Sequence, residues 1–251
     1  MPRAVKLGGG LVHIADDQPA FWDRVEAGRW EPGTLAVLDD LIDARTTFVD
    51  LGAWVGPTTL HAAGRARRVL AVEADPAALD QLRRNLAVNP DLSSRIEVVP
   101  NAIHPTAGPV SLGAKRKAGD SMSSVLLAGG PNAWTVDGIT PAELAARLAG
   151  DERIVLKLDV EGAEYGLLPH LGPLLTPRTI AILVSFHPRI AREAVGGSLP
   201  KALRGALRPL ARFSARPITA AGAGTRSFQP ALVRLRLRSA LRGDEWLFSR
   251  A

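Results

Sequence analysis

One segment organises this sequence, Val49-Asp50-Leu51-Gly52-Ala53-Trp54-Val55-Gly56. It is an apolar strand that runs into an acidic residue and then into a turn built of small residues. A second apolar segment, Leu70-Ala71-Val72-Glu73-Ala74-Asp75, carries the carboxylate of Glu73 23 positions after Asp50. Small residues in such a turn let the backbone approach a ligand closely. Because a carboxylate after the second strand can accept hydrogen bonds from both hydroxyls of a ribose, the two segments predict a site for an adenosyl group.

The residues of the turn distinguish two classes of adenosyl cofactor. A dinucleotide-binding turn carries three glycines as G-x-G-x-x-G and presents a helix N-terminus to a pyrophosphate. Here the turn has two glycines, Gly52 and Gly56, and Asp50 precedes them. A carboxylate repels a pyrophosphate but attracts a sulfonium or an ammonium group. The pattern therefore favours S-adenosylmethionine over NAD; the alternative is a strand-turn-helix unit of an α/β fold that binds no ligand.

The composition fits one large domain, or one domain with a cap. The chain has 251 residues, 46% of them hydrophobic, and no cysteine. It therefore forms no disulfide, offers no thiolate to a metal and lacks the cysteine nucleophile that methylates carbon 5 of a pyrimidine. The sequence has no apolar run long enough for a membrane span, and Gly8-Gly9-Gly10 interrupts the start that a signal peptide would need. We expect a cytoplasmic protein with no membrane partner.

Basic charge gathers toward the carboxyl end of the chain. The formal net charge is +6, and residues 197–251 hold eleven Lys and Arg against two acidic residues. Such a segment could bind nucleic acid, an acidic lipid surface or an anionic substrate, or it could only solubilise an Ala- and Leu-rich end. A single Tyr and 5% aromatic residues are few for stacking on single-stranded bases. We therefore expect no nucleic-acid partner, and a homodimer through this segment is left open.

Apolar strands alternate with helical segments through the middle of the chain. We expect strands at about 47–51, 69–74, 95–100, 154–158 and 180–186. Short βα repeats join neighbouring parallel strands, so this order predicts an α/β fold with a parallel sheet. The fourth strand should be followed by a helix at about 162–174.

The two ends of the chain have other patterns. Two helices, at 19–28 and 32–42, should form a cap, so that we divide the chain into a cap segment at 1–46 and a main domain at 47–251. Residues 233–238 alternate apolar and basic side chains, which predicts a strand that pairs as a hairpin with residues 245–248.

A second polar cluster follows the fourth expected strand, in Lys157-Leu158-Asp159-Val160-Glu161-Gly162-Ala163-Glu164. Ligands of open α/β sheets bind beyond the carboxyl ends of the strands, which is where these charges lie. Acids also suit a helix N-terminus, which would account for Glu161 and Glu164 but less well for Lys157 within the strand. His187 follows the fifth strand and should reach the same edge of the sheet.

From Trp30 to His187 the chain resembles the FkbM-type methyltransferases. The family's opening strand and turn match residues 49–56, and its acidic turn matches residues 72–76. The signature K-x-D-x-E-G-x-E is complete at residues 157–164 and is the most specific part of the resemblance. Two positions depart from the family: Trp54 stands in place of Asn, and Ser185 in place of a Glu two residues before the histidine.

The resemblance implies a Rossmann-like class I methyltransferase fold of five parallel strands, closed by the C-terminal antiparallel hairpin. It implies S-adenosylmethionine as the cofactor and, as the usual acceptor, a hydroxyl of a sugar or a natural product. By the same resemblance, the methionine part of the cofactor would face Asp50, Gly52, Ala53 and Gly56, the ribose would bind Glu73 with Ala74 beside it, and the adenine would lie near Asn101 and Ala102.

Methyl transfer to a hydroxyl needs a general base, because a neutral alcohol is a poor nucleophile. The candidates are Asp159, Glu161 and His187, and we add Lys157 as the fourth catalytic residue of the cluster. His187 would move a proton most readily near pH 7, although it could equally cap a loop before Pro188. Oxygen ligands around Asp159 could instead hold Mg²⁺, but the sequence does not require a metal and we predict none.

Four functions compete on this reading of the sequence. The leading one is an S-adenosylmethionine-dependent O-methyltransferase that acts on a small-molecule or saccharide acceptor. The second is an RNA methyltransferase that uses the basic C-terminal region, although the Asn/Asp-Pro-Pro-aromatic motif of adenine amino-methylating enzymes is missing from the fourth strand. The third is an adenosyl-binding module without activity. The fourth is an NAD enzyme, which the spacing of the turn disfavours.

Overall fold

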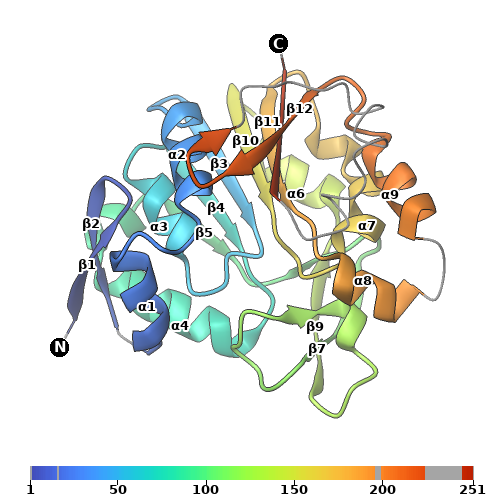
Figure 1. The fold of residues 1–251 in the computed structure, drawn as a ribbon, viewed down its shortest axis with the longest axis horizontal. Coiled ribbons are helices and arrows are strands. Elements are labelled where there is room, and N and C mark those ends of the chain that lie inside the picture. Colours follow the sequence, from blue (N-terminus) through green and yellow to red (C-terminus); the bar gives the residue numbers. More distant parts are fainter. Residues whose placement is uncertain (1, 16, 196–198, 224–244, 251) are drawn as a thin grey trace.

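Five parallel strands form the centre of the sheet in the computed structural model, which describes residues 2–15, 17–195, 199–223 and 245–250 (Figure 1). In spatial order they are β11 (Thr179–Ser185), β10 (Arg153–Leu158), β3 (Thr46–Leu51), β4 (Arg68–Val72) and β5 (Ile96–Val99). These are the five strands that the sequence predicts, and their carboxyl ends meet at one edge of the sheet. The predicted α/β fold with a Rossmann-like parallel sheet is thereby confirmed.

An antiparallel edge extends the sheet beyond β11. The last strand, β14 (Glu245–Ser249), pairs with β11 on one side and with β12 (Ser214–Thr219) on the other, and β12 pairs with β13 (Gly222–Ala223). The antiparallel strand at 245–248 is thus confirmed, while its expected partner at 233–238 lies outside the described residues. The sequence analysis did not predict β12.

Helices cover both faces of the sheet. On one face, α2 (Pro32–Leu41) and α3 (Pro57–Ala63) bury Phe48, Val155 and Leu183. The opposite face carries α6 (Pro141–Arg147), α7 (Glu164–Leu167) and α9 (Leu199–Leu207), which cover Val49 and Leu156. Because successive side chains of a strand point to opposite faces, neighbouring residues such as Phe48 and Val49 belong to different cores.

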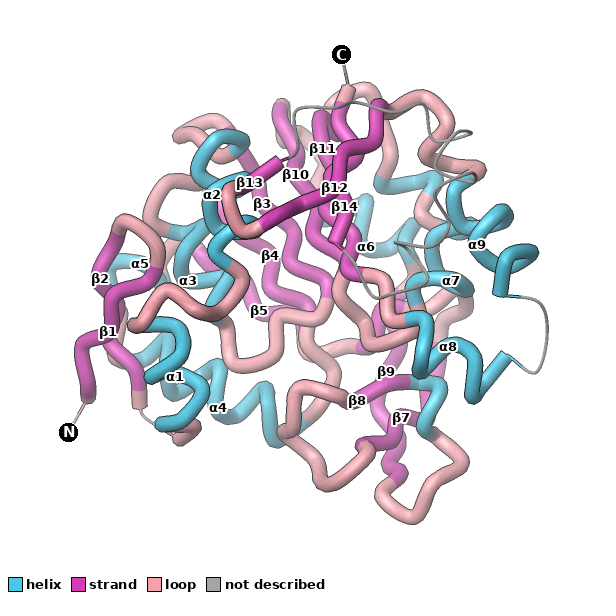
Figure 2. The backbone as a smooth tube through the Cα atoms, in the orientation of Figure 1, coloured by secondary structure: helices cyan, strands magenta, loops and turns pink. Residues whose placement is uncertain are grey.

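The N-terminal residues form the two helices that the sequence predicts, and the division into a cap at 1–46 and a main domain stays a prediction. A ribbon of β1 (Arg3–Leu7) and β2 (Gly10–Ile14) leads into α1 (Pro19–Glu26), and β2 contacts α4 (Pro76–Ala87), which α5 (Pro90–Ser93) follows (Figure 2). Two amides fasten the ribbon: the Asn85 Oδ1 accepts from the backbone N–H of Ala15, and the Asn89 Oδ1 from that of His13, both at 2.9 Å. The second predicted cap helix, α2, instead packs against the main sheet. The backbone of Gly33 in α2 lies so close to β12 that a Cβ at this position would stand 1.7 Å from the carbonyl oxygen of Thr219.

Between β5 and α6 the chain makes an excursion into a second sheet of four strands, in the order β6-β9-β7-β8. These are β6 (Ala102–Ile103), β7 (Gly108–Ala114), β8 (Ser123–Ser124) and β9 (Ala133–Ile139), with a 3₁₀ turn, η1 (Val125–Leu127), after β8. The excursion projects away from the main sheet, at the bottom of Figure 1. The excursion thereby brings the loop between β7 and β8 to the edge where β4 and β5 end.

The helix predicted at 162–174 is wrong in its length. Only α7 is α-helical, and two 3₁₀ turns follow it, η2 (Leu168–His170) and η3 (Gly172–Leu174). Pro169 and Pro173 explain the break, since proline lacks the N–H group that an α-helix needs and clashes with the preceding turn. After β11 comes α8 (Pro188–Val195). Within the described ranges, no helix is both long and apolar enough to cross a membrane.

Candidate active site

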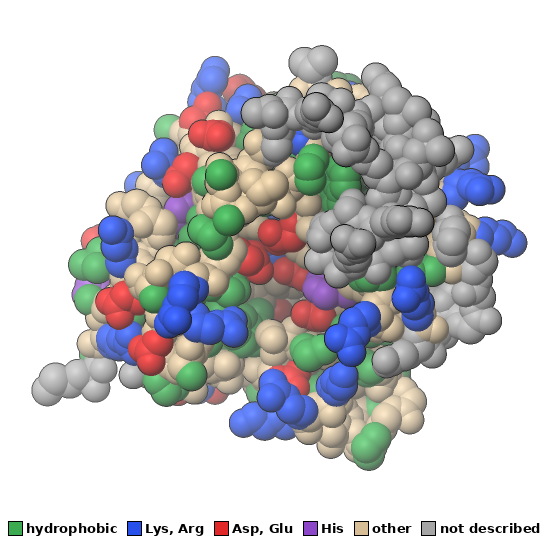
Figure 3. All heavy atoms as spheres, viewed as in Figure 1, with side chains coloured by type: hydrophobic (Ala, Val, Ile, Leu, Met, Phe, Trp, Pro, Cys, Tyr) green, Lys and Arg blue, Asp and Glu red, His purple; other side chains and the backbone are tan. Residues whose placement is uncertain are grey.

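A cavity of about 240 Å³ opens at the carboxyl ends of β3, β4, β10 and β11. Figure 3 shows acidic side chains gathered around a hollow in this face. Ten of the twelve residues predicted for the site line the cavity: Gly52, Ala53, Glu73, Ala74, Asn101, Ala102, Lys157, Asp159, Glu161 and His187. We call the wall made by residues 52–54, 73–75 and 101–102 the turn side, and the wall made by Lys157, Asp159, Glu161 and His187 the charged side.

On the turn side, the Glu73 carboxylate is held by backbone groups. Its Oε2 accepts from the N–H of Trp54 and its Oε1 from the N–H of Asp75, each at 2.7 Å. Burial raises the pKa of Glu73 to about 7, although the hydrogen bonds from Asp75 and Trp54 favour the ionised form. The side chain is therefore oriented without any ligand, beside the cavity and at the end of β4.

The two sides of the cavity touch at Gly52. Its φ of +89° lies in the left-handed region, and a Cβ at this position would stand 1.9 Å from the carbonyl oxygen of Asp159. Glycine therefore serves here to let the turn after β3 pack against the end of β10, in addition to any approach of a ligand. Gly56, which does not line the cavity, has a φ of +90° and would place a Cβ 2.5 Å from Leu82 in α4.

Asp50 lies behind the turn and does not line the cavity. Its side chain is fully buried, and its Oδ2 accepts from the hydroxyls of Thr58 and Thr59, both at 2.7 Å. Burial raises the pKa of Asp50, opposed by the Lys157 charge and by these two hydroxyls. In this geometry Asp50 supports the start of α3 and the turn, and its expected contact with the cofactor stays a prediction.

On the charged side, Lys157 and Asp159 form an ion pair of 2.6 Å between Nζ and Oδ2. Lys157 is in register with Asp50 of β3 and is only 3% exposed, so that its charge is held within the sheet edge. Although burial opposes ionisation of both groups, the pKa of Lys157 is raised by its acidic neighbours and that of Asp159 is lowered by Lys157 and His187. The pair is therefore ionised, and the second carboxylate oxygen of Asp159 faces His187.

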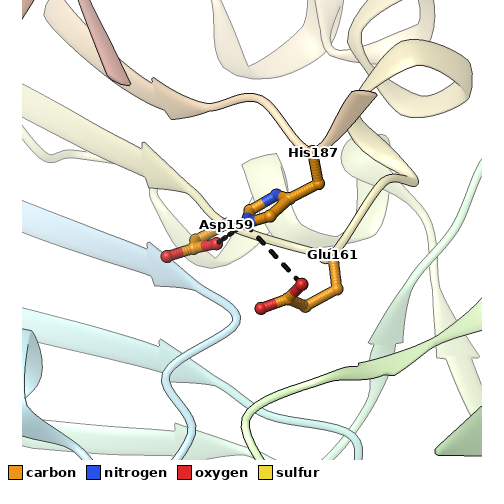
Figure 4. Close-up of side chains that lie close together, drawn as sticks. All are labelled: Asp159, Glu161 and His187. Carbon is orange, nitrogen blue, oxygen red and sulfur yellow. Dashed lines mark ion pairs between the residues drawn. The ribbon is translucent and has the colours of Figure 1, made fainter. Parts of the chain in front are cut away.

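A buried carboxylate orients His187. The Nδ1 atom lies 2.8 Å from Oε1 of Glu164, a fully buried side chain that also accepts from the N–H groups of Val160 and Gly162. The Nε2 atom consequently points toward Asp159 and Glu161, each 3.6 Å away, as the dashed lines of Figure 4 mark. Burial favours the neutral ring, but the hydrogen bond to Glu164 and the nearby acids outweigh it and raise the pKa of His187 to about 10. His187 is therefore an imidazolium at neutral pH.

Within the described residues the Glu161 side chain accepts no hydrogen bond. Its Oε2 atom lies 3.6 Å from Nε2 of His187. Burial, together with the charges of Asp159 and Glu164, raises its pKa to about 7, although His187 opposes this. Its backbone is left-handed, with a φ of +51°. The other two non-glycine residues of the described chain with positive φ, Glu31 and Trp54, line the same cavity. Strained backbone of this kind is typical of functional sites.

The same three residues offer a possible arrangement for a metal. One ligand atom from each of Asp159, Glu161 and His187 lies within 4.8 Å of the others. Lys157 already occupies one oxygen of Asp159, and the imidazolium carries a proton on the nitrogen that would bind an ion. The prediction that the site uses no metal stays a prediction.

The structure adds residues that the sequence analysis missed. Glu31 enters the cavity from the start of α2, and Phe21 of α1 packs edge-to-face on Trp54 with ring centroids 4.5 Å apart. The polar loop at residues 121–124, which the sequence did mark as a candidate near the site, lines the turn side, where the hydroxyl of Ser123 donates to Asp75 at 2.6 Å. No sequence signal would have found Glu31, because its place depends on how the cap packs against the sheet.

The sequence profile of the methyltransferase FkbM domain matches residues 50–208 of the chain. No curated protein matches it. The match spans the turn side, the charged side and their connecting elements, and includes every predicted site residue.

Solved structures with related folds come from several bacteria. A methyltransferase FkbM from Methylobacillus flagellatus KT is 16% identical, with a TM-score of 0.47 over 94% of this chain and 56% of that one. A precorrin-6y C5,15-methyltransferase from Geobacter metallireducens GS-15 is 14% identical, with a TM-score of 0.43 over 86% of this chain and 85% of that one. A SAM-dependent methyltransferase from Agrobacterium tumefaciens is 11% identical, with a TM-score of 0.43 over 98% and 69%. The family assignment rests on the sequence profile rather than on these distant likenesses.

Proposed function

The chain belongs to the FkbM methyltransferase domain family, and we propose that it transfers the methyl group of S-adenosylmethionine to a hydroxyl of a sugar or natural-product small molecule. Dependence on S-adenosylmethionine follows from the family. The hydroxyl acceptor, its chemical class and the roles of individual residues are the proposal.

The observation that carries the proposal is the pair formed by Glu161 and His187. A free carboxylate and an imidazolium lie 3.6 Å apart and face one cavity, beyond the strands where ligands of such sheets bind. An acceptor hydroxyl between them could lose its proton to Glu161 while its oxygen accepts a hydrogen bond from Nε2 of His187. Glu164 and Asp159 act as positioning residues, because they orient and hold the imidazolium.

The reaction balances as an in-line displacement. The acceptor oxygen forms a bond to the methyl carbon, the bond from that carbon to sulfur breaks, and the sulfonium becomes a neutral thioether. The hydroxyl proton goes to the Glu161 carboxylate and from there to solvent. Positioning and exclusion of water should supply most of the rate, with the general base adding about 10²–10⁴-fold.

Two assays test this function on the full chain. The first is the thermal unfolding of the protein with S-adenosylhomocysteine, with NAD and without ligand, where only the first ligand should raise the Tm. The second follows the methyl group of ¹³C-labelled S-adenosylmethionine by NMR into panels of hydroxyl, amine and carboxylate acceptors, since the carbon shift identifies the atom that is methylated. Transfer only to amines or carboxylates would overturn the hydroxyl assignment.

A pair of variants tests the role of Glu161. Glu161→Gln should lower turnover by about 10²–10⁴-fold and leave the affinity for S-adenosylhomocysteine unchanged, because only the base is removed. The matched control is Glu152→Gln, a glutamate that is exposed and remote from the cavity. Equal turnover in the two variants would assign the base elsewhere.

RNA remains the alternative acceptor, since eleven basic residues follow position 196. Arg234, Arg236 and Arg238, on which this alternative depends most, lie outside the described residues. Binding to RNA that weakens steeply as salt rises would support it, because binding to phosphates releases counterions. We keep a small-molecule acceptor and a cytoplasmic location as parts of the proposal.

A further inference from the structure

One carboxylate oxygen of Glu31 has no hydrogen-bond partner among the described residues. Glu31 lies just before α2, lines the cavity and has a left-handed backbone with a φ of +38°. The oxygen is Oε2, and it is buried. A buried acceptor without a donor costs free energy, and so does this backbone conformation in a residue other than glycine.

A second acidic residue before a helix shows what a structural role would look like. Asp75 precedes α4, and its Oδ1 caps the helix by accepting from the N–H groups of Ala77 and Ala78. Glu31 occupies the corresponding position of α2, yet its side chain makes no such bond to the helix. Capping therefore does not explain Glu31, which lines the cavity instead.

The surroundings of Glu31 suit a positively charged ligand group. Burial and the charges of Glu245, Asp159 and Asp50 raise its pKa to about 8, and Lys157 opposes them. Lys157 carries the positive charge that opposes this rise, and its Nζ atom already pairs with Oδ2 of Asp159 at 2.6 Å. At neutral pH Glu31 is therefore largely protonated in the free protein, and a ligand cation beside it would stabilise the ionised carboxylate.

We propose that Glu31 binds the α-ammonium group of the methionine part of S-adenosylmethionine. The position of Glu31 fits this contact. Glu31 interacts with Lys157, which is in register with Asp50 of β3. Asp50 in turn precedes the turn at Gly52 that borders the cavity. An ammonium group brings three donors and a positive charge to an oxygen that has no donor. This inference rests on the use of S-adenosylmethionine and not on the nature of the acceptor.

Isothermal titration calorimetry with two ligands tests the contact. The first ligand is S-adenosylhomocysteine, and the second is its deaminated analogue, which keeps the adenosine, the thioether and the carboxylate. Glu31→Gln should weaken the first ligand by about 10- to 100-fold, as expected for a hydrogen bond between charged groups, and should change the second less than two-fold. The control Glu152→Gln should leave both affinities as in the wild type.

Each other outcome would overturn the contact. Unchanged affinity for S-adenosylhomocysteine in Glu31→Gln would refute it, and equal losses for both ligands would mean that the variant damages the cavity as a whole. Absence of binding by the wild-type protein would refute the cofactor itself, which is a separate failure. A second variant, Glu31→Gly, accepts the left-handed backbone and removes the carboxylate; it should raise the Tm without ligand and lose the same discrimination between the two ligands.

Discussion

On the turn side of the cavity, the Glu73 carboxylate accepts hydrogen bonds from two backbone N–H groups. On the charged side, by contrast, Glu161 faces His187 at 3.6 Å without a hydrogen bond. The turn side is made of backbone that β3 and β4 fix in place. The charged side is made of long side chains from β10, β11 and their following loops, held by one buried ion pair and one buried carboxylate.

This difference separates binding from reaction. A preformed wall suits a ligand that is the same in every catalytic cycle, because little has to be reorganised when it binds. Charged groups that face one another without a direct hydrogen bond, as Glu161 and His187 do, suit the place where charge changes during the reaction. If this division is correct, substitutions on the two sides should change different measured quantities.

The largest effect is expected where the two sides touch. Gly52→Ala would drive a Cβ into the Asp159 carbonyl, and it would place alanine at a φ of +89°. Strain should cost about 1–3 kcal/mol of unfolding free energy, and overpacking about as much again. Denaturant unfolding should show this loss, and calorimetry should show no binding of S-adenosylhomocysteine. Gly166→Ala, where a Cβ meets nothing within 4 Å, is the control and should remain stable.

Glu73→Ala should weaken cofactor binding and, because two backbone N–H groups lose their acceptor, lower stability, but it should not change saturated turnover. Loss of a carboxylate that can bind both ribose hydroxyls should cost about 1.5–3 kcal/mol of cofactor binding free energy, or roughly 10- to 150-fold in Kd. Turnover at saturating cofactor should stay within about three-fold of the wild type, since this residue is remote from the reacting groups. A large fall in saturated turnover with unchanged Kd would contradict the division between the two sides.

The pH profile of turnover should report the charged side. Glu161 must be ionised to accept a proton, so turnover should rise with pH through about 7. His187 must keep its proton to donate to the acceptor oxygen, so turnover should fall as pH passes about 10. In His187→Gln the alkaline fall should be missing. A wild-type profile that falls through pH 7 instead would exclude Glu161 as the base.

The smallest effect concerns stability. The pKa of His187 is raised in the folded protein from 6.5 to about 10, so its protonation stabilises the fold fully below pH 6.5 and ceases to do so as pH rises through about 10. The Tm difference between wild type and His187→Gln should therefore be largest at pH 6 and should shrink toward pH 10. A difference that is constant with pH would show that the ring contributes only by packing.

Much of the turn side could be predicted from the sequence. The strands and the turn at Gly52 are local patterns, and the spacing of Glu73 from Asp50 follows from one βα unit. The order of the parallel strands then places Asp159 and His187 near each other, because both follow neighbouring strands. The proposed reacting pair, Glu161 and His187, was harder to predict from the sequence. The protonation of His187 depends on Glu164 and on burial that only the tertiary structure reveals.

Other features could not be predicted for physical reasons. Whether Asp50 faces a ligand or the hydroxyls of Thr58 and Thr59 depends on rotamers, which the sequence pattern does not specify. The inward direction of Glu31 depends on the packing of α2 against β12. The break of the expected helix after Leu167, by contrast, could have been predicted from Pro169 and Pro173.

The contacts of the Glu245 carboxylate affect the order in which the chain folds during its synthesis. One of its oxygens accepts from Thr34 at the start of α2, 211 positions earlier in the chain, and the other from Ser185 at the end of β11. Contacts between such distant residues form late, because a long loop must close before they can contribute. A nascent chain can assemble β3, β4 and their glycine turn early in synthesis. The contacts that join α2 to β11 through Glu245 form only after residue 245 has left the ribosome, so the turn side should assemble before this edge of the fold is closed.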